Sequence, residues 1–170
     1  IVVTGDVIDK RRPGTKHALD FFARAVKLAP VYYVAGNHEA VSAEYPALRR
    51  SVEEMGVHVL DDRSIALERG GGVITLAGVN DPITTDEAER NEALMREKLE
   101  NVIGEKQNYT VLLTHRPELF RIYREAGVDL VFAGHAHGGQ FRLPWGQGVI
   151  APNQGLFPKY TQGLYDEEGG

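Results

Sequence analysis

Four apolar segments of this 170-residue chain are each followed directly by glycine or threonine and then by side chains that can bind a metal. The apolar segments are residues 1–4, 31–35, 110–113 and 128–133. The sequences that follow them are Gly5-Asp6, Gly36-Asn37-His38-Glu39, Thr114-His115 and Gly134-His135-Ala136-His137. Short, wholly apolar runs are typical of strands covered on both faces. In α/β sheets, ligands gather at the carboxyl ends of the strands. If these strands are neighbours in one sheet, their polar side chains converge on one point, with the candidate ligands Asp6, Asn37, His115, His135 and His137.

Helical and strand-like patterns alternate along the whole chain. Helical spacing of apolar residues predicts helices over residues 14–28, 45–55, 84–103 and 117–126. The third of these helices is expected to begin at a cap formed by Thr84 or Thr85. Further strands are expected at residues 57–60, 64–67 and 73–79. This alternation predicts an α/β fold. Because no repeat, linker or low-complexity segment interrupts it, residues 1–170 are interpreted as one domain.

The amino-acid composition excludes several kinds of site and binding partner. The chain has no cysteine, which excludes disulfides, thiolate catalysis and thiolate zinc sites. Its net charge of −5 argues against a general electrostatic grip on nucleic-acid backbone or anionic lipid. The longest apolar or glycine run, residues 28–36, is far below the roughly 18 residues of a membrane span. Oxygen and imidazole donors without sulfur suit Mn, Fe, Zn, Co or Ni.

Each motif also has a plainer explanation. A glycine and an aspartate after a strand are usually only a turn, and a histidine such as His115 can be a hydrogen-bonded core residue. His135 and His137, two apart among glycines, have little packing value and therefore favour a functional role. Four such motifs, each at the end of an apolar strand, are hard to obtain by chance. By contrast, His17 and His58 lie outside any such motif and are interpreted as structural.

Together, the four motifs resemble the second to fifth signature blocks of the calcineurin-like metallophosphoesterases. The first of them is Gly5-Asp6-Val7-Ile8-Asp9, and the set covers most of the chain. Residues 134–144 and 153–155 resemble a bacterial branch of that family often described as membrane-associated phosphodiesterases. The resemblance implies a four-layer α/β/β/α sandwich around two divalent transition metal ions. It also implies hydrolysis of a phosphodiester, phosphomonoester or pyrophosphate bond by a metal-activated hydroxide.

The resemblance also implies roles for the candidate ligands. Asp6 would bridge both metals and share in catalysis. Asn37, His115 and His135 would complete the first metal site, and His137 would serve the second.

Other polar residues would act around the metals. We expect His38 to be catalytic, by stabilising the transition state or protonating the leaving group. Asp9 and Glu39 are expected to be carboxylates that orient the ligating imidazoles or the loop. Arg116 and Arg142 are candidate phosphate-binding residues.

One signature block is missing from the sequence. The family's first block, an Asp-x-His at the end of the first strand, has no counterpart before Ile1. We therefore expect the chain to be a piece of a longer protein, trimmed at both ends, that lacks the first strand and two ligands of the second metal. We expect the absence of the strand that would precede Ile1 to leave a gap or an exposed edge in the sheet.

Two further functional classes remain open at this point. The first is a scaffold of the same family that has lost catalysis and binds protein partners, although every ligand position inside the chain is intact. The second is a nuclease of the same fold, against which the acidic balance and the lack of a basic, aromatic stripe weigh. The expected substrate is a small-molecule or lipid-linked phosphoester, not a nucleic acid. Localisation is open between a cytoplasmic, a membrane-peripheral and an exported bacterial protein, with any membrane anchor expected before Ile1.

Overall fold

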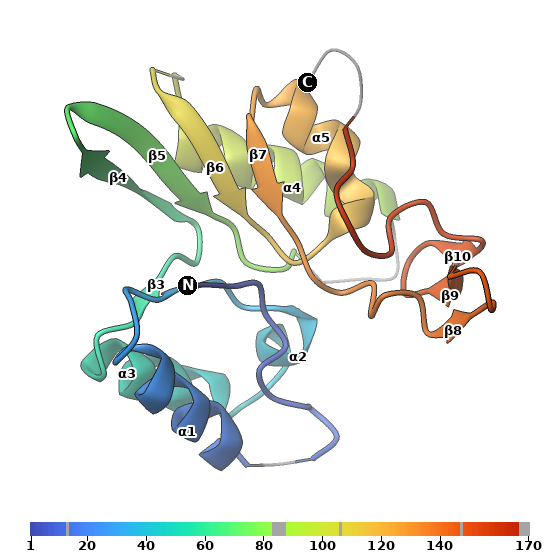
Figure 1. The fold of residues 1–170 in the computed structure, drawn as a ribbon, viewed down its shortest axis with the longest axis horizontal. Helices are drawn as coiled ribbons and strands as arrows, with labels where there is room; N and C mark the ends of the chain where they lie inside the picture. The colour runs from blue at the N-terminus through green and yellow to red at the C-terminus, as the bar shows by residue number, and fades with distance from the viewer. Residues whose placement is uncertain (13, 83–87, 106, 147, 167–170) are drawn as a thin grey trace.

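The computed structural model describes residues 1–12, 14–82, 88–105, 107–146 and 148–166, which form two helix-covered sheets and a small third sheet (Figure 1). The first sheet is parallel, in the order β1 (Val2–Val3), β2 (Tyr32–Tyr33) and β3 (His58–Val59). The helices α1 (Lys16–Ala25) and α3 (Tyr45–Glu54) cover it. Both helices match the predicted ranges within a few residues at each end. Their apolar faces bury Phe22 and Val52 against Tyr33.

Strand β1 lies at the edge of this sheet, because the strand order is β1-β2-β3. Ile1 and Val2 are 43% and 39% exposed. The expectation of a fully buried strand at residues 1–4 is therefore wrong, while the expected exposed edge is present. The physical reason is that β1 has a hydrogen-bonded neighbour on only one side among the described residues.

The second sheet has the order β4 (Arg63–Arg69), β5 (Gly72–Gly78), β6 (Tyr109–Leu113) and β7 (Leu130–Phe132). β4 and β5 form an antiparallel hairpin, and β5, β6 and β7 are parallel. The helix α4 (Ala88–Ile103) covers this sheet together with α5 (Phe120–Glu125), which follows the short 3₁₀ helix η1 (Pro117–Leu119). Met95 and Leu99 of α4 pack into the same core as Leu112 of β6. The expected cap at Thr84 or Thr85 lies outside the described residues.

A third apolar layer lies between the two sheets. Val34 and Leu60 from the first half pack against Leu76, Val111 and Leu113 of the second. The sheets thus face each other, with helices outside each of them (Figure 1). The chain is an α/β protein, as predicted, in which the first sheet is parallel and the second is mixed.

The third sheet was not predicted. It is antiparallel, in the order β10 (Gly155–Leu156), β9 (Gly148–Ala151) and β8 (Phe141–Arg142). Its strands are too short, and too rich in neighbouring glycine and proline, to give a period-2 pattern. Within the described parts of the chain, no helix is both long enough and apolar enough to cross a membrane.

Candidate metal centre

Each of the four motifs follows a strand, and two come from each large sheet. Asp6 follows β1, and Asn37 begins the short helix α2 (Asn37–Ala40) after β2. His115 follows β6, and His135 follows β7. Ligand atoms of Asp6, His115 and His135 all lie within 4.8 Å of one another. The opposed sheets thus bring residues from distant parts of the sequence to one point.

His115 is at the centre of this cluster. Its Nε2 atom lies 3.1 Å from Asp6 Oδ2, 3.0 Å from Asn37 Oδ1 and 3.1 Å from His135 Nδ1. Three electron-rich atoms therefore surround one ring nitrogen.

The outer hydrogen bonds of the two imidazoles fix where their protons are. His115 Nδ1 lies 2.6 Å from the carbonyl oxygen of Thr4, which only accepts, so Nδ1 donates. His135 Nε2 lies 2.8 Å from Asn153 Oδ1 and donates to it. In the neutral imidazoles, the lone pairs of His115 Nε2 and His135 Nδ1 then point into the cluster. One additional proton would satisfy only one of the contacts, whereas one cation would satisfy all of them. The donor set therefore fits a divalent metal ion.

The cluster is largely buried, and its charges are coupled. His115 is 1% exposed and His135 is 9% exposed. Burial raises the pKa of Asp6, but its hydrogen bond and attraction to His115 outweigh this and hold the pKa below its usual value. Burial lowers the pKa of His115, but the hydrogen bond and attraction to Asp6 outweigh this and raise the pKa above its usual value. Burial dominates at His135 and lowers its pKa, which favours the neutral, metal-binding form.

Close packing of backbone around the cluster requires glycine at two positions. A β-carbon on Gly5, whose φ is +94°, would lie 2.5 Å from the Cα of Gly36. A β-carbon on Gly36 would lie 2.4 Å from Asp6 Oδ1. Asp6 and His135 themselves have φ values of 56° and 60°, in the left-handed region that costs non-glycine residues free energy. Asp6 and His135 thus have strained backbone conformations that direct their side chains into the cluster.

Glu39 organises the loop around Asp6. It is 1% exposed, and its carboxylate accepts hydrogen bonds from three backbone amides. These are Asp6 N at 2.7 Å, Gly36 N at 2.8 Å and Ile8 N at 3.0 Å. Glu39 therefore contacts the loop backbone, which is one of the two roles expected of it.

His38 lies next to the cluster without belonging to it. Its backbone amide donates to Asp6 Oδ1 at 2.9 Å. Its ring Nδ1 lies 3.1 Å from the backbone amide of Lys10 and 3.3 Å from Asp9 Oδ1. Asp9 Oδ1 also accepts a hydrogen bond from the backbone amide of Arg11 at 2.9 Å, so Asp9 contacts His38 and its own loop, not a ligating imidazole.

The remaining candidates lie elsewhere. His137 is exposed, and among the described residues it is not part of the cluster. Arg142 is exposed and donates to Gln162 and to the carbonyl of Gly146. Arg116 was expected to clamp a phosphate, but its side chain is only 4% exposed. It is held by the buried carboxylate of Asp81 and by Glu118, so it does not present a free guanidinium to a substrate.

Asn153, which orients His135, was not among the predicted site residues. Asn153 lies between β9 and β10, in the sheet that was not predicted. Its motif was noticed only as part of a family resemblance, because nothing in residues 153–155 alone indicates a contact with a histidine.

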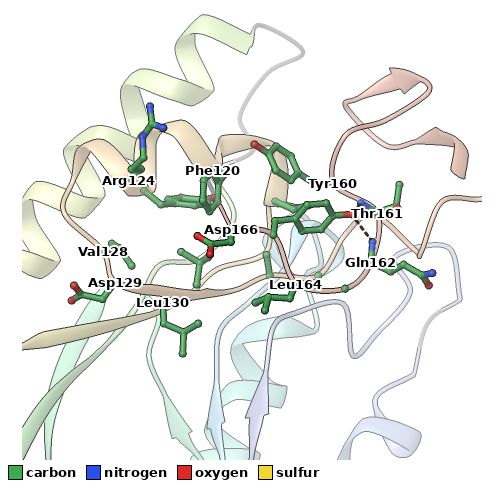
Figure 2. Close-up of a pocket in the computed structure, with 18 residues that line it drawn as sticks. Phe120, Arg124, Val128, Asp129, Leu130, Tyr160, Thr161, Gln162, Leu164 and Asp166 are labelled. Carbon is green, nitrogen blue, oxygen red and sulfur yellow. Dashed lines mark hydrogen bonds between the residues drawn. The ribbon is translucent and has the colours of Figure 1, made fainter. Parts of the chain in front are cut away.

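A cavity of about 280 Å³ lies beside the cluster, between α5, β7 and residues 160–166. Figure 2 shows Phe120 and Arg124 on the helix side and Tyr160, Thr161 and Gln162 on the other. Gly134 and Ala136, which flank His135, contribute to its lining, but the cluster residues do not. The cavity is therefore a neighbour of the candidate metal centre and not part of it.

The sequence profile of the calcineurin-like phosphoesterases matches residues 1–139, which include all the described cluster residues except Asn153. The chain therefore belongs to the calcineurin-like metallophosphoesterase family.

Relatives of this chain are bacterial. It is 31% identical over 149 residues to YkoQ, an uncharacterized metallophosphoesterase of Bacillus subtilis, covering 85% of this chain and 52% of that protein. It is 34% identical over 156 residues to an uncharacterized metallophosphoesterase of Aquifex aeolicus, covering 82% and 51%. The chain thus spans about half the length of these curated relatives. Among solved structures, it is similar to the NAD nucleotidase NadN of Haemophilus influenzae, with a TM-score of 0.48 and 17% identity over 93% of this chain and 40% of that one.

Proposed function

We propose that this chain forms part of a metal-dependent phosphoesterase that hydrolyses a phosphodiester, phosphomonoester or pyrophosphate bond. The observation that carries the proposal is the set of lone pairs around His115 Nε2, contributed by Asp6, Asn37 and His135. The family membership supports the same conclusion. In this proposal the complete protein has the four-layer α/β/β/α sandwich, for which the three stacked apolar cores are the support.

The oxygen and nitrogen ligands of the cluster suit divalent cations that bind an anionic substrate. Asp6, Asn37, His115 and His135 would hold the first of two divalent ions, and Asp6 and His137 would contribute to the second. When bound, such ions lower the pKa of a coordinated water and neutralise phosphoryl oxygens. The carboxamide of Asn37 binds without adding negative charge, so the site stays attractive to an anionic substrate.

His38 has the geometry of a proton donor. Because the backbone amide of Lys10 donates to its Nδ1, the neutral ring carries its proton on Nε2. The side chain is 17% exposed. We assign it the protonation of the leaving-group oxygen, which general acids perform.

The proposal is tested by metal content and hydrolysis measured together. The purified chain is stripped with EDTA and titrated with Mn²⁺, and the full-length protein is assayed on bis(4-nitrophenyl) phosphate. We expect the chain to bind Mn²⁺, the full-length protein to hydrolyse the diester only with metal, and Asp6→Ala to abolish both properties. His17→Ala is the matched control, because His17 is an exposed histidine of α1 far from the cluster in sequence and sheet.

Absence of Mn²⁺ and Zn²⁺ binding would refute the metal centre. Metal binding by the full-length protein without hydrolysis of any phosphoester would favour the scaffold alternative. Faster cleavage of single-stranded DNA than of a diphosphate lipid and a generic diester would favour the nuclease.

A further inference from the structure

Asp81 connects the two loops that carry Asn37 and His115. Its backbone amide donates to the carbonyl of Ala35 at 3.1 Å, two residues before Asn37. Its carboxylate accepts a hydrogen bond from Arg116 Nε at 2.8 Å, immediately after His115. One residue in the segment that follows β5 is therefore hydrogen-bonded to a loop from each sheet.

The ion pair that Asp81 forms is completely enclosed. The side chains of Asp81 and Arg116 are 0% and 4% exposed, and Arg116 also donates to Glu118 Oε1 at 3.2 Å. Buried ion pairs are weak contributors to stability, because desolvation offsets their attraction. Such a pair does fix the relative orientation of its two side chains, because a guanidinium donates its hydrogen bonds in a rigid plane.

Tyr123 also holds the segment from Thr114 to Arg116. Its side chain is fully buried, and its hydroxyl donates to the carbonyl of Arg116 at 2.7 Å. The hydroxyl of Thr114 lies 3.0 Å from the hydroxyl oxygen of Tyr123 and donates to it, because the tyrosine proton is already directed to Arg116. The residues on both sides of His115 are thus fixed by one phenol.

We propose that Asp81, acting through Arg116 and supported by Tyr123, is a positioning residue that holds His115 at the distance from Asn37 that a single cation requires. This inference rests on the proposed function, since it assigns a role behind the metal ligands. It replaces the phosphate-binding role expected of Arg116. Partners that orient metal ligands typically change metal affinity about 10–100-fold when removed.

The test is the Mn²⁺ affinity of the chain, measured by calorimetric titration alongside the midpoint of thermal unfolding. We expect Asp81→Asn to weaken Mn²⁺ binding about 10–100-fold. The matched control is Leu99→Ala, which opens the same core that contains Tyr123 and lowers the unfolding midpoint without touching either loop. It should leave the affinity unchanged. Arg116→Lys should retain more affinity than Arg116→Gln, because lysine keeps a donor and the charge.

Tyr123→Phe provides a second test if Asp81→Asn does not fold, because it removes one hydroxyl and keeps the ring. We expect it to weaken Mn²⁺ binding more than Leu99→Ala does. The inference is overturned if Asp81→Asn folds and binds Mn²⁺ with unchanged affinity. If Asp81→Asn does not fold, unchanged affinity in Tyr123→Phe overturns it. An equal loss of affinity in Leu99→Ala also overturns it. Failure of the unsubstituted chain to bind Mn²⁺ instead overturns the proposed function, and the inference with it.

Discussion

His38 and His135 both follow glycine-flanked turns, yet hydrogen bonds leave different ring nitrogens of the two available. His135 donates from Nε2 to Asn153 and keeps the lone pair of Nδ1 for the cluster. His38 accepts at Nδ1 from the backbone of Lys10 and keeps a proton on Nε2. The same side chain therefore suits metal binding in one place and proton donation in the other.

This difference predicts opposite effects of two substitutions. In the full-length protein, His38→Ala should lower turnover about 10²–10⁴-fold, the usual contribution of a general acid, and retain the bound metal. His135→Ala should lose metal first. Metal content by elemental analysis and initial rates on one diester measure both effects, and His58→Ala, an exposed histidine of β3, should change neither. Loss of metal in His38→Ala would show that its role is ligation.

Glu39 carries a second prediction, because its carboxylate satisfies three backbone amides in a buried loop. Each amide left without an acceptor costs about 1–3 kcal/mol. Glu39→Ala should therefore lower the free energy of unfolding by several kcal/mol and abolish Mn²⁺ binding, as measured by urea unfolding and titration. Glu44→Ala is the control, because that half-buried residue accepts a solvent-exposed hydrogen bond from one backbone amide, Gly14 N. If both substitutions cost the same, the loop does not depend on Glu39.

Among the elements, α4 and α5 are joined by a chain of surface charges. Glu125 pairs with Arg96 at 2.6 Å and with Arg121 at 3.0 Å, and Arg121 also pairs with Glu92 at 2.9 Å. The hydrogen bond from Arg96 is the main cause that lowers the pKa of Glu125. A lowered pKa means that this stabilisation is present above the unfolded-state pKa of Glu125 and is lost as the pH falls through its folded-state pKa.

Glu125→Gln should therefore lower the thermal midpoint at pH 7 and have no effect at pH values below the folded-state pKa of Glu125. The difference at pH 7 should also shrink at high salt, because exposed pairs are screened. Thermal unfolding followed by circular dichroism at the two pH values measures it. A difference that persists at low pH would mean that packing and not charge is responsible.

How far the sequence predicted these elements depended on the length of the pattern. The helices α1 and α3 were placed within a few residues, because each has apolar residues at helical spacing and a clear end. The parallel strand β6 was recognised from its continuous apolar run. The strands β8 to β10 were missed because glycine and proline interrupt the sequence around them, whereas the equally short β1 to β3 lie within longer strand-like runs. The contact of Asn153 with His135 was missed for the same reason.

The candidate metal centre could also be predicted only in part from the sequence. The convergence of Asp6, His115 and His135 could be expected because ligands gather at the carboxyl ends of strands, although these strands lie in two facing sheets and not in one. The burial of Arg116 could not, since its partner Asp81 is 35 residues away and no local pattern links them. Long-range ion pairs are set by how the sheets pack, which one sequence does not disclose.

In the whole molecule, the candidate metal centre connects the two halves of the fold. Asp6 and Asn37 come from the first sheet, and His115 and His135 come from the second. The halves also meet through the apolar layer around Leu76 and through the hydrogen bond from Asp81 to Ala35. A bound cation would add one more link between them, so it would stabilise the folded state as a whole.

This arrangement predicts that Mn²⁺ raises the thermal midpoint of the EDTA-treated chain. At a free Mn²⁺ concentration of about 100 times its Kd, binding to the folded state alone adds about 2.7 kcal/mol, or about 5–10 °C for a chain of this size. His135→Ala and Asp6→Ala should each abolish the shift, although they lie in different halves, and His17→Ala should retain it. A full shift in either ligand variant would mean that Mn²⁺ binds elsewhere, because a cation held between the sheets requires donors from both of them.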